Sequence, residues 1–78
     1  MKLLNKKESV KEKFLVPKVK LRQERLSREL TTTFMADLIG LKNRRQYELK
    51  EKGEAPFKDY EIAVISQHFK MSENELFF

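Results

Sequence analysis

The sequence predicts an all-α fold, a small domain of four or five helices. With two glycines and two prolines among 78 residues, the chain has few positions that interrupt a helix. Apolar residues recur at spacings of three and four, and no segment alternates cleanly enough for a strand. They make up 40% of the chain, enough for one thin core, because a domain this small buries only about 60% of its unfolded surface.

The first helix is expected over residues 17–28. Pro17 favours the first turn, where its missing amide hydrogen costs no hydrogen bond. Leu21 and Arg25 are four residues apart and therefore share the face that turns inward. This segment opens the predicted domain, residues 17–78.

A short second helix is expected over residues 32–39. Thr31 is a good N-cap, because its hydroxyl can satisfy a free amide of the next turn. Met35 and Ala36 lie on the inward side of this helix. Gly40 follows, at a place where helices commonly end in the left-handed conformation.

The third helix is expected to start after Asn43, another capping residue, and to run to about Lys52. Gly53 then ends it. Tyr47 and Leu49 are two residues apart, so in a regular helix only one of them can face the core of the domain.

The last two helices follow a loop at residues 54–56. Asp59 is the expected N-cap of a helix that runs to Phe69. Its inward face carries apolar residues at spacings of three and four, namely Ile62, Ile65 and Phe69. Ser72 and Glu75 match a capping box, which opens a final turn. That turn carries three apolar residues: Leu76, Phe77 and Phe78.

Positive charge is concentrated at the front of the chain. The formal net charge is +5, yet residues 1–28 hold ten basic and three acidic residues, whereas residues 29–78 hold seven and nine. A second basic cluster comprises Lys42, Arg44, Arg45, Lys50 and Lys52. Clustered positive charge attracts phosphate, although a solvated lysine-rich surface explains the charge alone equally well.

The lysine-rich leader, residues 1–16, has three interpretations. Its lysines are Lys2, Lys6, Lys7, Lys11 and Lys13. A flexible basic arm would contact phosphates, whereas a disordered tail would have no such role. Leu3, Val10 and Phe14 fall on one helical face, which favours an extra helix instead.

Two short helices joined by a glycine turn, the second one basic, form the helix-turn-helix pattern. The residues in and around these two helices match, in order, the sequence pattern of a known protein family. The first half of the pattern is Leu21, Arg25, Leu30-Thr31, Met35-Ala36 and Gly40. The second half is Glu51-Lys52-Gly53, Pro56, Ile65, Phe69, Ser72 and Leu76-Phe77. Over residues 18–78 the chain thereby resembles the lambda repressor/Cro-like family, also called XRE, and most of all its small regulators from phages and mobile elements.

This resemblance implies a lambda-repressor-like DNA-binding domain, a transcriptional regulator whose third helix lies in the major groove and whose second helix starts near a phosphate. The residues expected to contact DNA are Thr31, Thr32, Lys42, Asn43, Arg44, Arg45, Gln46, Leu49 and Lys50. Arginine can pair bidentately with guanine and glutamine with adenine, which makes Arg44, Arg45 and Gln46 the candidate base readers. Thr31 has an alternative role, which is to cap the helix without contacting DNA. Leu49 likewise has an alternative role, which is to pack in the core.

The resemblance also implies an ion pair. Arg25 and Glu51 occupy positions at which many family members join the first helix to the third in this way. Two features depart from the common pattern. Gly40 and Gly53 are separated by one residue more than is usual, and Glu29 stands where a turn glycine is common. The extra residue allows a shift of one position in the register of the base readers.

The sequence offers little for catalysis or metal binding. It contains no cysteine, no glycine-rich phosphate loop and no nucleophile motif. His68, the only histidine, is expected to be a surface or packing residue. Asp59 and Glu61 are two residues apart, on different helix faces, and so form no convincing catalytic pair. We therefore expect no enzymatic activity, no cofactor and no small-molecule substrate.

Double-stranded DNA is the expected partner, bound by a homodimer for which Phe77 and Phe78 are a candidate apolar surface; filling the domain's own core is their alternative role. No apolar run has the length of a membrane span, which favours a cytoplasmic protein. Two other functions stay open: a protein-interaction module on the same fold, either an antirepressor or a dimerisation partner, and an excisionase-like architectural protein that bends DNA. The basic and polar residues at 44–46 favour DNA over the interaction module.

Overall fold

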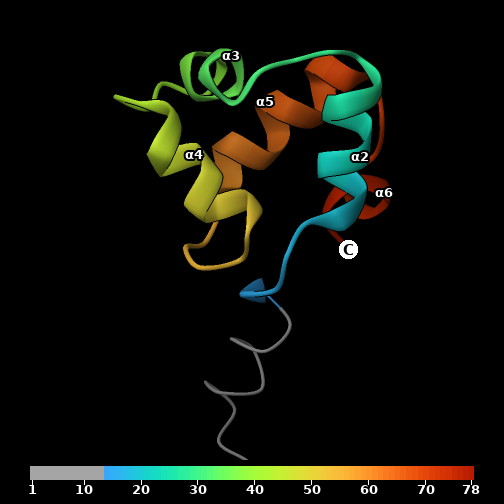
Figure 1. The fold of residues 1–78 in the computed structure, drawn as a ribbon. Helices are drawn as coiled ribbons and strands as arrows, with labels where there is room; N and C mark the ends of the chain where they lie inside the picture. The colour runs from blue at the N-terminus through green and yellow to red at the C-terminus, as the bar shows by residue number, and fades with distance from the viewer. Residues whose placement is uncertain (1–13) are drawn as a thin grey trace, which may run out of the picture.

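The computed structural model describes residues 14–78, so the expectations for most of the leader lie outside the described part of the chain. Five helices lie wholly within these residues, which contain no strand, and the all-α prediction is thereby confirmed (Figure 1). The helices are α2 (Val19–Ser27), α3 (Thr32–Leu38), α4 (Arg44–Glu51), α5 (Asp59–Phe69) and α6 (Glu73–Phe77).

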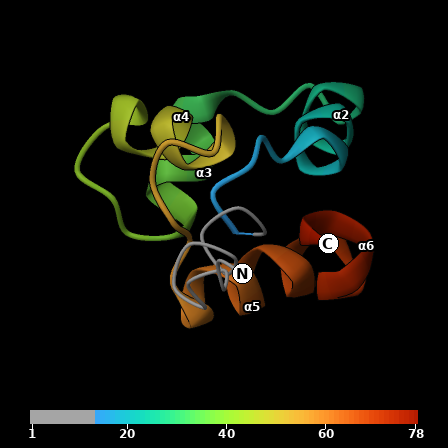
Figure 2. The ribbon, with the colours of Figure 1, turned by 90° about the horizontal axis from the view of Figure 1, so that it is seen from below.

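The helices form two layers, with α2, α3 and α4 on one side and α5 and α6 on the other (Figure 2). α3 packs against α4, and α6 packs against both α2 and α5. α2 also contacts α4, which joins the first described helix to the third. Each of the helices α2 to α6 contributes to the buried core, which consists of Leu21, Met35, Ala36, Ile39, Tyr47, Ile62, Ile65, Phe69, Leu76 and Phe77.

Side-chain caps start three of the helices at the residues that the sequence predicts. The Thr31 hydroxyl accepts the Phe34 amide hydrogen at 3.0 Å, which caps α3. The Asn43 side chain caps α4 by accepting the amide hydrogen three residues on, at 3.1 Å. Ser72 and Glu75 form the predicted capping box of α6, each side chain accepting the other's amide hydrogen at 3.1 Å. These bonds are local, which is why sequence spacing identifies them.

The predicted cap of α5 was wrong by one residue. Lys58 is the N-cap and Asp59 is the first helical residue. The Glu61 carboxylate accepts the Lys58 amide hydrogen at 2.8 Å and so stabilises a helix start one residue earlier than expected.

The start of α2 also differs from the prediction. Lys18 is its N-cap and Val19 its first residue, so Pro17 precedes the helix instead of lying in its first turn. The Lys18 amide donates to the carbonyl of Glu51 at 2.8 Å. A contact with the end of α4, distant in sequence, thus determines where α2 begins.

Left-handed backbone conformations close the turns around α3 and α4. Gly40 and Gly53 have φ angles of 77° and 83°, and Glu29 adopts φ of 57° despite its side chain. Gly53 is also pressed against the segment that leads into α2, since a Cβ there would lie 2.3 Å from the Val16 carbonyl carbon. Any side chain at Gly53 would therefore displace that segment.

Candidate nucleic-acid interface

The α3–turn–α4 unit presents a row of exposed cationic and polar side chains at the start of α4. These residues are Lys42, Asn43, Arg44, Arg45 and Gln46. The turn before them is closed by the Leu41 amide, which donates to the Ala36 carbonyl at 2.8 Å. Within residues 14–78, neither Arg44 nor Arg45 forms an ion pair. Their guanidinium groups are thus available to an external acceptor.

Gln46 contributes to the fold of the turn as well as to the exposed row. Its amide hydrogen is bound by Asn43, and its side-chain oxygen accepts the Lys42 amide hydrogen at 3.1 Å. The bond to Lys42 orients the Gln46 side chain and leaves one lone pair of its oxygen for another donor. The two arginines therefore carry the stronger case for base reading.

The predicted ion pair between Arg25 and Glu51 is present and bidentate. Arg25 Nε donates to Oε2 at 2.8 Å and Nη2 to Oε1 at 3.0 Å. The Tyr47 hydroxyl donates to the same carboxylate at 2.6 Å, and Arg25 Nη1 donates to the Leu30 carbonyl at 2.9 Å. The network joins α2 and the turn after it to α4, so it fixes how α4 is oriented.

Burial changes the titration of this network. Tyr47 is fully buried, and desolvation followed by its bond to Glu51 raises the pKa of its hydroxyl well above the ordinary value. The hydrogen bond to Glu51 raises the pKa of Arg25. Around neutral pH, the tyrosine thus stays protonated and continues to donate.

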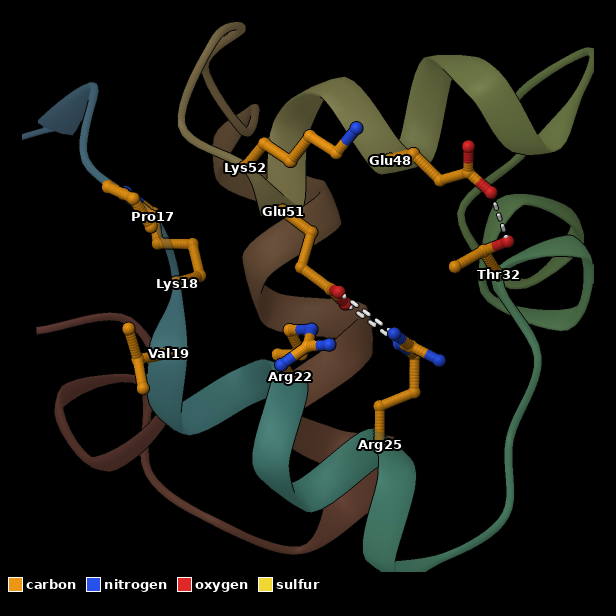
Figure 3. A pocket seen from close by; sticks show the side chains of 9 residues that line it. All are labelled: Pro17, Lys18, Val19, Arg22, Arg25, Thr32, Glu48, Glu51 and Lys52. Atoms are coloured by element: carbon orange, nitrogen blue, oxygen red, sulfur yellow. Dashed lines mark hydrogen bonds and ion pairs between the residues drawn. The ribbon is translucent and has the colours of Figure 1, made fainter.

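A second bond, between α3 and α4, was not anticipated from the sequence. The Thr32 hydroxyl donates to Glu48 Oε2 at 2.6 Å (Figure 3). This bond, and then the nearby charges of Arg44, Lys52 and Arg45, lower the pKa of the Glu48 carboxyl. Glu48 is thus an anion within the basic surface. The pairing depends on how two helices cross, so sequence spacing carries no signal for it.

A pocket of about 390 Å³ opens between α2 and α4, beside this bond (Figure 3). Its lining comprises Pro17, Lys18, Val19, Arg22, Arg25, Thr32, Glu48, Glu51 and Lys52. The Arg25–Glu51 pair lines it, and so do three more cationic residues. Lys18 is buried and its ammonium donates to backbone carbonyls, whereas Arg22 of α2 and Lys52 at the end of α4 are exposed. Lys52 belongs to the second basic cluster of the sequence and Arg22 to the basic front of the chain, but no sequence pattern indicates that the two meet at one pocket.

The prediction that Lys50 lies on the exposed surface and contacts DNA is wrong. Only 8% of its surface is accessible, and its ammonium donates to Glu61 Oε1 at 2.6 Å and to the Pro56 carbonyl at 3.0 Å. It lies three residues after Tyr47, on the buried face of α4. That spacing is the signal that would have identified it.

The remaining predicted residues differ in their burial and in their contacts. Leu49 is half-buried, since Tyr47 takes the core position. Thr31 serves as a cap, with its side chain engaged by Phe34. His68 is exposed, and its ring centre lies 5.4 Å from that of Phe34, as expected of a surface residue.

No protein-family model, curated protein or solved structure matches this chain. In the part of the chain that the structure describes, every helix is too short or too polar to cross a membrane.

Proposed function

We propose that this chain binds duplex DNA at specific sites through α4 and regulates transcription. The observation that carries the proposal is the pair of exposed arginines, Arg44 and Arg45, at the start of α4. The other end of this helix is held by the buried contacts of Glu51 with Arg25 and Tyr47. An α-helix fits the major groove, where arginine pairs bidentately with the O6 and N7 of guanine. The family resemblance of the sequence supports the repressor type of regulator.

The anchoring supports a reading role for α4. A helix that reads bases must present its side chains in a constant orientation. A buried bidentate ion pair resists rotation of the helix, because breaking the pair leaves a buried charge without a partner. Glu51 binds both Arg25 and Tyr47, at the end of α4 opposite to the exposed arginines. Exposed cations on either side of the helix, such as Lys42 and Lys52, suit the flanking phosphates.

The test begins with selection of bound duplexes from a random pool, followed by affinity measurements on the enriched site. Arg44→Ala and Arg45→Ala are each expected to cost about 1–3 kcal/mol on that site and to relax the preference at one or two base pairs. Lys20→Ala is the matched control: it removes an exposed cation from α2 on the side that faces Glu75 of α6. If a variant with both Arg44 and Arg45 changed to alanine binds and discriminates like Lys20→Ala, α4 does not read bases and the proposal fails.

We also propose that the protein binds DNA as a homodimer. One short helix contacts few base pairs. Two copies on adjacent half-sites bind more tightly and recognise a longer DNA site. Phe77 is 4% exposed and belongs to the core, whereas Phe78 is 49% exposed and available to a second copy.

A further inference from the structure

Two exposed cations line the pocket between α2 and α4, and neither is a candidate base reader. Arg22 and Lys52 are exposed and reach it from two different helical segments (Figure 3). Within the described residues, no carboxylate forms an ion pair with either of them. Two unpaired cations at one hollow attract an anion more strongly than either does alone.

An anion of the chain itself already lies at this pocket. The Glu48 carboxylate lines it and is positioned by the Thr32 hydroxyl at 2.6 Å. That contact uses Oε2, and the Glu48 side chain makes no other hydrogen bond to the described residues. Its attachment is therefore a single bond at the surface, which a side-chain rotation breaks.

We propose that Glu48 is an intramolecular competitor for a phosphate of the DNA backbone at this pocket. The inference rests on the proposed function, since the phosphate comes from bound duplex DNA. Arg22 and Lys52 attract that phosphate, whereas the carboxylate repels it from the same place and neutralises part of the cationic field. Glu48 accordingly weakens binding to every duplex, whatever its sequence.

The test compares Glu48→Gln with a variant of equal charge. The glutamine keeps an acceptor for the Thr32 hydroxyl while removing the negative charge. Glu73→Gln, on the exposed surface of α6, changes the net charge equally at a distant place. Dissociation constants are measured by fluorescence anisotropy for a selected duplex and for a duplex of random sequence, over a series of salt concentrations.

Glu48→Gln is expected to bind both duplexes about three- to tenfold more tightly at low salt, with the gain shrinking as salt screens the charge. Glu73→Gln is expected to bind like the wild type, and base preference is expected to stay unchanged. Equal affinities of the two variants would overturn the inference. A changed preference at one base pair would overturn it too, because Glu48 would then contact a base.

The location of the phosphate is tested in a second background. With Arg22 and Lys52 both changed to Gln, the Glu48→Gln gain is expected to disappear; its persistence would place the phosphate elsewhere and refute the proposal. Failure of this inference differs visibly from failure of the proposed function. In the first case the alanine variants of Arg44 and Arg45 still lose site-specific binding, whereas in the second they bind like Lys20→Ala.

Discussion

Individual buried charges determine how α4 is held. Glu51 is bound by Arg25 and Tyr47, and Glu61 is bound by Lys50. Removing a carboxylate from water is costly, and each of these is compensated by a cation at 2.6–2.8 Å. Such pairs contribute little to the net free energy of unfolding, but removing one partner leaves the other charge buried and unpaired, which is strongly destabilising. They therefore favour one arrangement of the helices over others.

Tyr47 makes this network sensitive to alkaline pH. Its pKa is raised above the ordinary 10.0, so the folded state retains the phenolic proton that the unfolded chain releases. The stabilisation that the Tyr47 hydroxyl contributes is therefore fully present below about pH 10, and it declines as the pH rises towards the folded-state pKa. We expect Tyr47→Phe to lose about 1.5–3 kcal/mol at neutral pH, since a donor to a buried carboxylate is removed, and to show a shallower alkaline decline.

Urea unfolding from neutral pH to about pH 11 measures both effects. Tyr60→Phe is the control, because Tyr60 is exposed and should keep the wild-type alkaline slope. An equal slope in the wild type and both variants would show that Tyr47 does not cause the decline.

The α3–turn–α4 element depends on its two glycines to different degrees. Both have positive φ, but a Cβ at Gly40 meets no atom within 4 Å, whereas a Cβ at Gly53 meets the Val16–Pro17 backbone. The turn at Gly53 thus sets both the end of α4 and the approach of the chain into α2. Lys18, in that approach, donates its amide hydrogen to Glu51.

Alanine substitutions separate the two roles. Gly40→Ala is expected to cost about 1–2 kcal/mol, the penalty of a left-handed non-glycine residue. Gly53→Ala is expected to cost about 3 kcal/mol or more, because the backbone must also move. Chemical denaturation of both variants checks the order, and similar costs would mean that the close approach at Gly53 is relieved without loss.

The whole molecule separates the proposed DNA-reading end from an aromatic surface. In Figure 1 the start of α4 and the C-terminal helix α6 lie on different sides of the domain. Phe78 and Phe14 meet edge to face with ring centres 5.5 Å apart, next to an apolar pocket of about 360 Å³. Exposed apolar surface of this kind favours association, and here it leaves the proposed DNA-reading end free.

The assembly prediction follows from this arrangement. We expect a weak monomer–dimer equilibrium that shifts to the dimer on a site with two half-sites roughly 34 Å apart. Phe78→Ser should weaken the dimer without unfolding the domain, whereas Phe34→Ser, an exposed aromatic of α3, should not. Sedimentation equilibrium with and without the selected duplex measures this. One protein molecule on a site without a repeated half-site would contradict it.

Local patterns in the sequence predicted the helical class and most helix ends, and the family resemblance predicted the Arg25–Glu51 pair. Caps such as Thr31 and Asn43 act within one turn of the backbone, and apolar spacing reports a helix face directly. The pair was reached through the resemblance rather than through local spacing.

The partners of neighbouring charges depend on tertiary packing. Lys50 and Lys52 are two residues apart and of one type, yet the first binds buried Glu61 and the second lines a pocket. Likewise the bond from Thr32 to Glu48 exists because α3 and α4 cross at that point. The choice of partner depends on the packing of helices distant in the sequence, and a local pattern of residues contains no information on that choice.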